Sequence, residues 1–479
     1  MRPEQKGSLV VRPELGRVVP DELGTVHFIG IGGSGMSGIA RVLAQRGLTV
    51  SGSDRSASEV TESLQASGIT VSVGHDPSNL GQATTVVISS AVREDNPELM
   101  EARARGLQVL HRSEALRWIM RGKRVLAVAG SHGKTTSTAM LATALDRSGR
   151  PIGAVNGGVV SEWGVSSRWG EDELFVIEAD ESDRSFVDYR PAVAMVTNIA
   201  PDHLDFYGTL DAIYDSFEDF VRSATETVVL CADDEGTRHL ATRLGDDVAT
   251  LTYGTTSGAD VVQTDLVAGP VASFTVAYQG ASARCELGVP GRLNALNASG
   301  VIATLVASGY SLDEAASAAS GFRGADRRFQ FHGEIGGVRF YDDHAHHPTE
   351  VAAALETARA VVGEGSVITM FQPHLYSRTQ YMAGELAGAF SAGSDHTIFL
   401  DIFGSREDPI EGVTTDLILQ KMAIGASFEF EPDWESACEL AVSRAQPGDI
   451  VLTMSTGDLY QIVPLLLATK RRIDEASGG

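Results

Sequence analysis

Cysteine is scarce in this chain of 479 residues, which contains only three of them. They are far apart and include no CxxC pair: Cys231, Cys285 and Cys438. This scarcity excludes a disulfide framework and a cysteine-rich zinc module. No run of about 18 uncharged apolar residues is present, so we expect no membrane insertion. Residues Met1 to Val19 have no sustained apolar stretch, and we expect them not to be a signal peptide.

Positive charge is also in short supply. The 38 Lys and Arg residues face 63 Asp and Glu residues, which gives a formal net charge of −25. Binding to nucleic acid or to an anionic membrane requires a basic face, so we expect neither partner. A few local donors can still hold the phosphates of a small molecule. The 43% of hydrophobic residues and the 51 glycines predict a cytoplasmic α/β protein, which we expect to be a monomer or homodimer.

The length predicts about three domains at roughly 150 residues each, and we place them at residues 1–122, 123–325 and 326–479. Apolar runs that alternate with helical patterns predict βαβ units in an α/β fold. The predicted strands are Thr25–Gly30, Leu48–Ser53, Thr84–Ser89, Val125–Ala129, Leu174–Ala179, Val193–Asn198, Thr227–Ala232, Arg339–Asp342, Ser366–Phe371, Thr397–Asp401 and Ile450–Met454. Helices are predicted at Met36–Arg46 and from about Thr135, and an antiparallel patch at Asp260–Val289.

A glycine-rich turn, Gly30–Gly35, matches GxGxxG between a predicted strand and a predicted helix. Small residues at such a turn let the backbone approach a diphosphate at the helix N-terminus. Asp54 ends the next strand, where an acid can bind a ribose hydroxyl. The pattern by itself leaves three interpretations open, namely NAD, another nucleotide diphosphate, or a tight turn.

A second glycine-rich loop follows the predicted strand Val125–Ala129. Its residues are Gly130, Ser131, His132, Gly133, Lys134, Thr135 and Thr136. The spacing is the short GxxGK[ST] form, in which backbone N–H groups cradle phosphates, the Lys neutralises the β and γ oxygens and the Thr hydroxyl binds Mg²⁺. The chain has only five lysines and one lies in this loop, which favours ATP or GTP binding over a plain glycine turn.

Acidic residues and histidines cluster after later strands. The segments Glu178–Asp183 and Asp202–Asp205 follow successive strands, where α/β sheets gather their ligands. Carboxylates and one imidazole suit Mg²⁺ bound to phosphates, although each loop alone is equally compatible with a solvated turn. A third cluster, Asp342–His347, contains three histidines in four residues. We favour substrate contacts over zinc there, because adjacent rings chelate one ion poorly and no cysteine assists.

Eight stretches occur in order along the chain: GIGGSGMSGIA, GSHGKTT, EADESD, TNIAPDHLD, PGRLNALNA, DRRF, HHPTE and FQPH. Together they resemble the motifs of the Mur ligases, and the resemblance extends from about Val26 to Asp458. It implies three domains: an N-terminal Rossmann-like domain for a UDP sugar, a central P-loop ATPase domain and a C-terminal Rossmann-like domain for an amino acid. The first glycine loop is thereby reassigned to the diphosphate of a UDP sugar.

The resemblance also implies roles for single residues. For ATP it implies the loop residues Gly130, Ser131, His132, Gly133, Lys134, Thr135 and Thr136. It further implies Asn294 and Asn297 at the adenine, and Arg328 and Asp343 at the phosphates and the ribose, with Lys134, His203 and Arg328 in the chemistry. For Mg²⁺ it implies Thr135, Glu178 and His203. For the UDP sugar it implies Gly32, Gly33, Ser34, Asp54 and Ser89, and for the amino acid and the reacting carboxylate it implies His346, His347, His374 and Arg378. His344, Ala345, Leu293 and Leu375 depart from the expected family pattern.

The activity implied by the resemblance is ATP-dependent ligation of L-alanine to the lactyl carboxylate of UDP-N-acetylmuramate through an acyl phosphate, in peptidoglycan precursor synthesis. Three alternatives stay open. One is a ligase of the same family that attaches a recycled tripeptide. The others are an NAD-dependent oxidoreductase built on Gly30–Gly35, which leaves the second glycine loop unexplained, and a non-catalytic P-loop switch.

Overall fold

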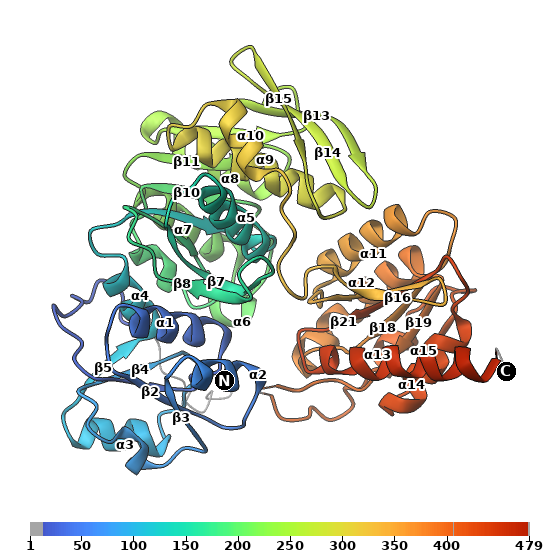
Figure 1. The fold of residues 1–479 in the computed structure, drawn as a ribbon, viewed down its shortest axis with the longest axis horizontal. Helices are drawn as coiled ribbons and strands as arrows, with labels where there is room; N and C mark the ends of the chain where they lie inside the picture. Colours follow the sequence, from blue (N-terminus) through green and yellow to red (C-terminus); the bar gives the residue numbers. More distant parts are fainter. Residues whose placement is uncertain (1–12, 406, 478–479) are drawn as a thin grey trace, which may run out of the picture. The chain divides into compact units, whose positions relative to one another are not determined.

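The computed structural model of the protein describes residues 13–405 and 407–477 and divides into two compact units (Figure 1). The first unit comprises Met1–Asp265, Phe274–Cys285 and Leu296–Phe322, and the second comprises Leu266–Ser273, Glu286–Ala295 and Arg323–Gly479. The prediction about a signal peptide falls largely on residues 1–12, outside the described range. Within that range, none of the helices combines the length and apolarity needed to cross a membrane.

The first sheet of the first unit has five parallel strands in the order β3-β2-β1-β4-β5. Its strands are β1 Val26–Ile29, β2 Val50–Asp54, β3 Thr70–Val73, β4 Thr85–Ile88 and β5 Gln108–His111. Its helices are α1 Ser34–Gln45, α2 Glu59–Ala66, η1 Pro77–Leu80, α3 Pro97–Ala104 and α4 Arg112–Ile119. All four residues of β1 are buried, because α1 covers the sheet with its apolar side chains. The order reverses beside β1, and ligands of α/β sheets bind at such a switch point.

A buried carboxylate ties the strands of this sheet to α3. Glu98 is fully buried, and its oxygens accept hydrogen bonds from the Ser53 hydroxyl and, at 2.6 Å, from the Asn79 amide. His27 approaches the same carboxylate to 3.6 Å. Burial opposes the charge, but these contacts outweigh it and lower the pKa of Glu98 to about 2. The charged form of Glu98 is therefore part of the folded state.

We expect Glu98→Gln to destabilise the protein most at pH 7 and progressively less as the pH falls through 4 and 3. A carboxyl group whose pKa is depressed on folding stabilises the fold above its unfolded pKa and loses that contribution as the pH falls towards the folded pKa. The shift corresponds to about 3 kcal/mol in the free energy of unfolding at neutral pH. Scanning calorimetry of both proteins at pH 7, 4 and 3 measures it.

The control for this prediction is Glu101→Gln on the same helix, which breaks an exposed pair with Arg105. Exposed pairs contribute roughly 0–1 kcal/mol, so this variant should follow the parent protein at every pH. A Glu98→Gln protein as stable as the parent at pH 7 would contradict the assignment.

The second sheet of the first unit has ten strands in the order β15-β14-β13-β12-β11-β10-β6-β9-β7-β8. The strands are β6 Arg124–Ala129, β7 Gly153–Val160, β8 Val165–Arg168, β9 Leu174–Glu178, β10 Val193–Val196, β11 Thr227–Cys231, β12 Thr250–Gly254, β13 Val261–Ala268, β14 Ala272–Tyr278 and β15 Ala281–Glu286. The helices are α5 Lys134–Arg147, η2 Ser185–Asp188, α6 Leu204–Tyr207, α7 Leu210–Arg222, α8 Glu235–Leu244, η3 Gly245–Asp247, α9 Arg292–Ala307 and α10 Leu312–Ala319. The central strand β6 runs parallel to both neighbours, β10 and β9, and leads directly into the loop before α5.

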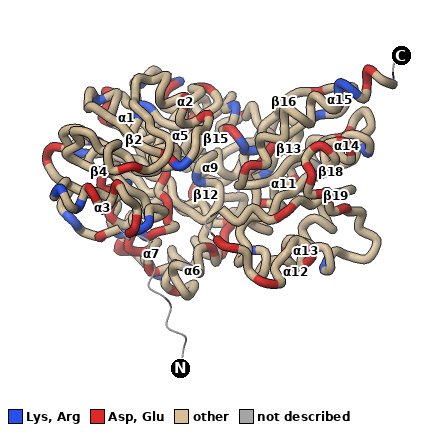
Figure 2. The backbone as a smooth tube through the Cα atoms, turned by 90° about the horizontal axis from the view of Figure 1, so that it is seen from below, with Lys and Arg blue, Asp and Glu red and all other residues tan. Residues whose placement is uncertain are grey.

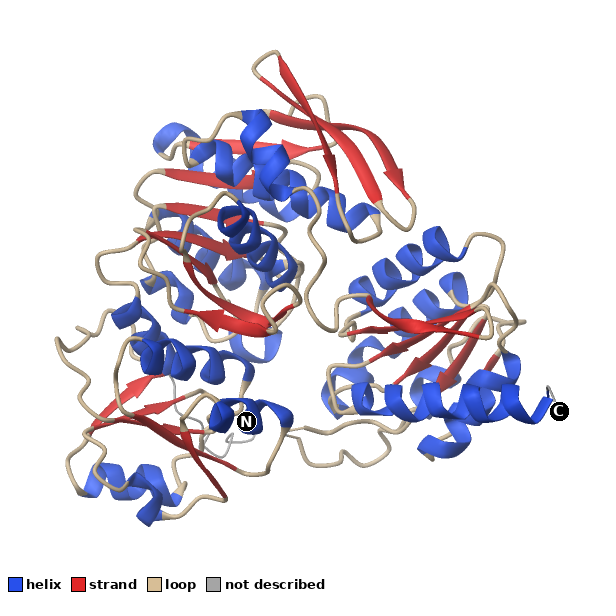
Figure 3. Ribbon diagram, in the orientation of Figure 1, coloured by secondary structure: helices blue, strands red, loops and turns tan. Residues whose placement is uncertain are grey.

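The second unit contains a six-stranded sheet in the order β16-β17-β21-β18-β19-β20. Its strands are β16 Gln330–Ile335, β17 Val338–Asp343, β18 Val367–Phe371, β19 His396–Phe399, β20 Phe428–Phe430 and β21 Ile450–Met454. Its helices are α11 Pro348–Val362, α12 Tyr376–Gly393, α13 Asp416–Leu419, α14 Trp434–Arg444, η4 Leu459–Ile462 and α15 Val463–Ser477. Separate apolar clusters, one with α11 and α12 and one with α14 and α15, cover the two faces of this sheet (Figure 3).

The predicted strands all form, with ends that shift by at most two residues. The segment Asp260–Val289 forms β13, β14 and β15, which lie side by side and are joined by short turns that only antiparallel neighbours allow. The β7–β8 hairpin escaped prediction, since it carries glycines instead of a clear apolar alternation. Figure 2 shows Asp and Glu scattered over both units, with Lys and Arg between them.

Candidate active site

The loop between β6 and α5 has a backbone that requires glycine at two positions. Gly130 has φ +138° and Gly133 has φ +82°, both outside the usual range of other residues. A Cβ on Gly130 would lie 2.0 Å from the Thr197 hydroxyl, and one on Gly133 would lie 2.9 Å from Oδ1 of Asn297. The side chain of Asn297, a predicted adenine contact, therefore lies directly against the phosphate-loop residue Gly133.

The end of β10 holds this loop in place. The Asn198 side chain accepts a hydrogen bond from the His132 N–H at 2.9 Å and donates to the His132 carbonyl at 2.9 Å. The Thr197 hydroxyl donates to the same carbonyl at 2.6 Å. The Ser131 hydroxyl accepts from the Ala200 N–H at 2.9 Å. The stretch TNIA thus acts as a clamp that fixes the conformation of the loop.

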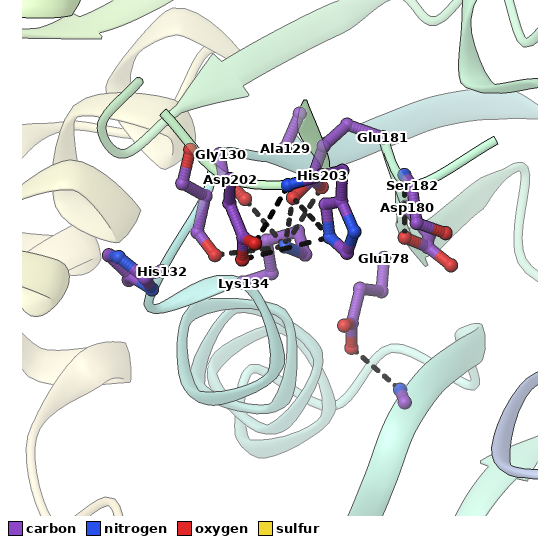
Figure 4. A network of polar contacts seen from close by, with 12 residues as sticks. Ala129, Gly130, His132, Lys134, Glu178, Asp180, Glu181, Ser182, Asp202 and His203 are labelled. Atoms are coloured by element: carbon purple, nitrogen blue, oxygen red, sulfur yellow. Dashed lines mark hydrogen bonds and ion pairs between the residues drawn. The ribbon is translucent and has the colours of Figure 1, made fainter. Parts of the chain in front are cut away.

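Lys134 lies at the centre of a charged cluster (Figure 4). Its ammonium group is 2.8 Å from Oε2 of Glu181 and donates to the carbonyl of Gly130 at 2.6 Å. Both side chains of the ion pair are largely buried, with exposed fractions of 14% for Lys134 and 3% for Glu181. Burial works against the charge of Lys134, but Glu181 and the neighbouring carboxylates raise its pKa overall. The lysine is therefore a fixed cation at the start of α5, suited to an anionic phosphate.

The predicted metal ligands Thr135 and Glu178 lie together. The Thr135 hydroxyl donates to Oε1 of Glu178 at 3.1 Å, and Oε2 of Glu178 accepts from the Gly157 N–H at 2.7 Å. In Figure 4, Glu178 lies apart from the cluster around Lys134. Within the described part of the chain, no group of three His, Cys, Asp or Glu side chains could hold a metal by itself. The oxygen pair fits Mg²⁺, which typically uses one or two protein ligands together with phosphates and water.

The third predicted ligand, His203, faces other carboxylates. Its Nε2 is 3.8 Å from Glu181 and 3.8 Å from Asp202, and its backbone has φ +53° at the start of α6. The histidine therefore belongs to the cluster around Lys134, on the side of the loop where phosphates are expected.

The first glycine loop is fixed by the acid predicted to accompany it. Oδ2 of Asp54 accepts the Gly32 N–H at 2.8 Å, and a Cβ on Gly32 would lie 2.9 Å from that oxygen. Gly33 is the N-cap of α1 and offers no capping side chain, so the first turn of the helix lacks a cap from that position. Ser34 begins α1, and Ser89 follows β4 at the same edge of the sheet.

In the second unit, Asp343 organises the loop after β17. Its two oxygens accept the N–H groups of Phe329 and Ala345, each at 2.7 Å. Burial raises the pKa of Asp343 to about 6, although the charge of Arg328 works in the opposite direction. Arg328, predicted to meet ATP phosphates, is thus electrostatically coupled to the predicted ribose contact.

Of the four residues predicted to bind the amino-acid substrate, three lie near one another and the fourth caps a helix. The rings of His346 and His374 are 5.8 Å apart, and Arg378 approaches Nδ1 of His374 to 3.3 Å. His347 instead caps α11, where its Nδ1 accepts the Thr349 N–H at 3.3 Å, and only 6% of the residue is exposed. His346, His374 and Arg378 are therefore better placed than His347 to meet a ligand. Asn294, a predicted adenine contact, donates to the Pro290 carbonyl at 2.7 Å.

Several residues of the site were not assigned an individual role from the sequence, although Glu181 stood in the acidic segment considered for Mg²⁺. Glu181, Thr197 and Asn198 all stand inside the quoted motifs, so their chemistry was visible but their partners were not. Arg112, which contacts the loop after β9, belongs to none of them. No local pattern could reveal it, because its partners follow about 70 residues later.

The fold and this geometry define an α/β enzyme with a phosphate-binding loop and a second glycine loop at a switch point. Family models match most of the chain: "Mur ligase family, catalytic domain" at residues 25–124, "Mur ligase middle domain" at 128–305 and "Mur ligase, glutamate ligase domain" at 327–457. The chain belongs to the Mur ligase family. It is an ATP-dependent ligase, as the family is.

Named relatives agree with this placement. The chain is 50% identical over 464 residues to a UDP-N-acetylmuramate–L-alanine ligase of Clavibacter sepedonicus, covering 97% of both chains. It is 45% identical to the same-named protein of Thermobifida fusca, covering 93% of this chain and 97% of that one. The crystal structure of the UDP-N-acetylmuramate–alanine ligase of Thermotoga maritima superposes with a TM-score of 0.80 at 28% identity, covering 94% and 99%.

Proposed function

We propose that this protein joins L-alanine to the lactyl carboxylate of UDP-N-acetylmuramate at the expense of ATP, in the synthesis of peptidoglycan precursors. The observation that carries the proposal is the buried Lys134 in a clamped phosphate loop, in a chain 50% identical to a ligase of that name. Because ATP and nucleotide sugars are metabolites of the cell interior, the reaction takes place in the cytoplasm. The oligomeric state, monomer or homodimer, stays a prediction.

The proposed reaction has two steps. The lactyl carboxylate attacks the γ-phosphorus of ATP and gives an acyl phosphate and ADP. The amine of L-alanine then attacks the acyl carbon and expels phosphate. The first step brings a carboxylate towards a triphosphate, so cations must screen their repulsion and hold the attack in line.

The chain's own residues supply most of that screening. Lys134 exchanges Glu181 for the β and γ oxygens, and the N–H groups of the clamped loop bind the remaining oxygens. Arg328 adds a second positive charge, and Asp343 binds the ribose. Mg²⁺, held by Thr135, Glu178 and His203, would neutralise phosphate charge. His346, His374 and Arg378 bind and orient L-alanine.

The experiment that tests this function measures phosphate release with a panel of UDP-muramyl acceptors and amino acids or peptides. Release is expected only with UDP-N-acetylmuramate and L-alanine together. Faster release with a tripeptide than with L-alanine would favour the recycling ligase. Nicotinamide absorbance changes without ATP consumption would favour an oxidoreductase, and ATP turnover without dependence on a UDP sugar would favour a switch.

We expect Asp54→Asn to weaken the binding of UDP-N-acetylmuramate by at least about tenfold and to leave ATP binding nearly unchanged. The carboxylate holds the Gly32 N–H at 2.8 Å, and charged hydrogen bonds contribute roughly 1.5–3 kcal/mol. Isothermal titration with each ligand separately measures both affinities. Asp76→Asn, which alters a turn of the same sheet, serves as the matched control. Equal loss of both ligands in Asp54→Asn would point to misfolding instead.

A further inference from the structure

Arg112 is the first residue of α4, in the first sheet of the first unit, yet its side chain pairs with residues of the second sheet. Its Nη2 lies 2.8 Å from Asp180 and 3.1 Å from Asp183, both in the loop after β9. Only 15% of the Arg112 side chain is exposed. Burial works against its charge, but the two carboxylates outweigh burial and raise its pKa. The guanidinium is therefore a permanent cation between the two sheets.

The acidic loop is held to the first sheet at more than one point. The carboxylate of Asp183, 6% exposed, also accepts the Ser90 hydroxyl at 3.0 Å and lies 3.5 Å from Nε2 of His111. Ser90 follows directly after Ser89, one of the residues predicted to meet the UDP sugar. The position of the loop is thus set by residues that surround the first glycine loop.

The same guanidinium lies against that glycine loop. A Cβ built on Gly35 would lie 3.1 Å from Nη1 of Arg112, which is closer than side chains normally pack. Gly35 is the last glycine of the Gly30–Gly35 turn. An anion bound at this turn would meet the free donors of the guanidinium, which has five N–H groups in total.

The same acidic loop also contacts the predicted ATP site, through Glu181. Glu181 stands between Asp180 and Asp183 in the sequence and forms the ion pair with Lys134. ATP must replace Glu181 as the partner of Lys134. Any interaction that shifts the acidic loop therefore changes the free energy with which ATP replaces Glu181 at Lys134.

We propose that Arg112 is a positioning residue that couples the two nucleotide sites, so that a UDP sugar at the glycine loop promotes ATP binding at Lys134. The diphosphate accepts hydrogen bonds from Arg112 and thereby weakens the contacts of Arg112 with Asp180 and Asp183. The acidic loop can then shift, which lowers the free energy needed to separate Lys134 from Glu181. By linkage, ATP promotes UDP-sugar binding by the same factor. The proposal rests on the proposed function, because it requires the glycine loop to bind a UDP sugar.

The test is a titration of the full-length protein with a non-hydrolysable ATP analogue, with and without saturating UDP-N-acetylmuramate. The parent protein is expected to bind the analogue at least about fivefold more tightly when the UDP sugar is present. In Arg112→Gln this factor should fall to within about twofold of one. In Arg112→Lys, which retains the charge but not the fork of donors, it should be intermediate.

Arg117→Gln is the matched control. Arg117 lies on the same helix and pairs with Asp188 at 3.4 Å, so this variant also removes an ion pair between the two sheets. It should retain the coupling of the parent protein, and a mere loss of structure would affect both variants alike. Should Arg112→Gln fail to fold, Arg112→Lys carries the same test.

Two results would overturn the proposal: no positive coupling in the parent protein, or full coupling in Arg112→Gln or, if that variant does not fold, in Arg112→Lys. Failure of the proposed function looks different, because UDP-N-acetylmuramate alone would then not bind the parent protein at all.

Discussion

Lys134→Ala is expected to lower phosphate release by a factor of about 10³, while the variant still binds UDP-N-acetylmuramate. The lysine is the buried cation of the clamped loop, and removal of one preorganised electrostatic group typically costs 10²–10³ in turnover. The first glycine loop belongs to another sheet and does not include Lys134, so the variant should keep its UDP-sugar site. Phosphate release and isothermal titration measure the two effects.

The substitution leaves Glu181 as a buried carboxylate without its cation, which is costly for the fold. The double variant Lys134→Ala/Glu181→Gln removes that charge and should fold like the parent protein and be just as inactive. Lys421→Ala, on an exposed residue of the second unit, is the control and should keep full activity. If either Lys134 variant keeps a tenth or more of the turnover, the loop does not bind the reacting phosphate.

Glu178→Gln is expected to raise the Mg²⁺ concentration needed for half-maximal activity by at least about tenfold. Its carboxylate shares a hydrogen bond with Thr135 at 3.1 Å, and the loss of a ligand group or its support typically costs 10–100-fold in metal affinity. Activity measured over a wide range of Mg²⁺ checks this. High Mg²⁺ should restore part of the lost turnover.

Glu173→Gln is the control for this titration, since Glu173 precedes the same strand and 71% of its side chain is exposed. An unchanged Mg²⁺ requirement in Glu178→Gln would remove Glu178 from the metal site. The same Mg²⁺ titration of His203→Ala, together with the KM for L-alanine, decides whether His203 binds the metal or the amino acid. A higher Mg²⁺ requirement keeps His203 with the metal, whereas a higher KM for L-alanine alone assigns it to the amino acid.

The two glycine loops and the strands around them were predictable because each depends on a short stretch of chain. Gly130–Thr136 follows an apolar strand and starts a helix, and both the spacing and the left-handed glycines are local properties. Asp54 was predictable for the same reason, as it ends the strand next to the loop. The prediction did not extend to its contact with the Gly32 N–H, which only the folded loop shows.

The different roles of the three histidines after β17 could not be predicted from the local sequence. Three of them stand within four residues, and the sequence treats them as equivalent. The structure separates them, because His347 is at the N-cap of α11 and its Nδ1 accepts a hydrogen bond from that helix. His346 meets His374 instead, a residue 28 positions later whose ring is brought close by β18 and α12.

The sequence by itself determined the α/β class, the positions of the predicted strands and the two glycine-rich turns, because hydrophobic periodicity and glycine backbone preferences act over a few residues. Only the tertiary structure decided which charges are paired. Lys134 meets Glu181 across 47 residues, and Arg112 meets Asp180 and Asp183 across 68 and 71. In this chain of net charge −25 each cation has many possible partners, and the sheet order selects among them by bringing the carboxyl ends of separate strands to one edge.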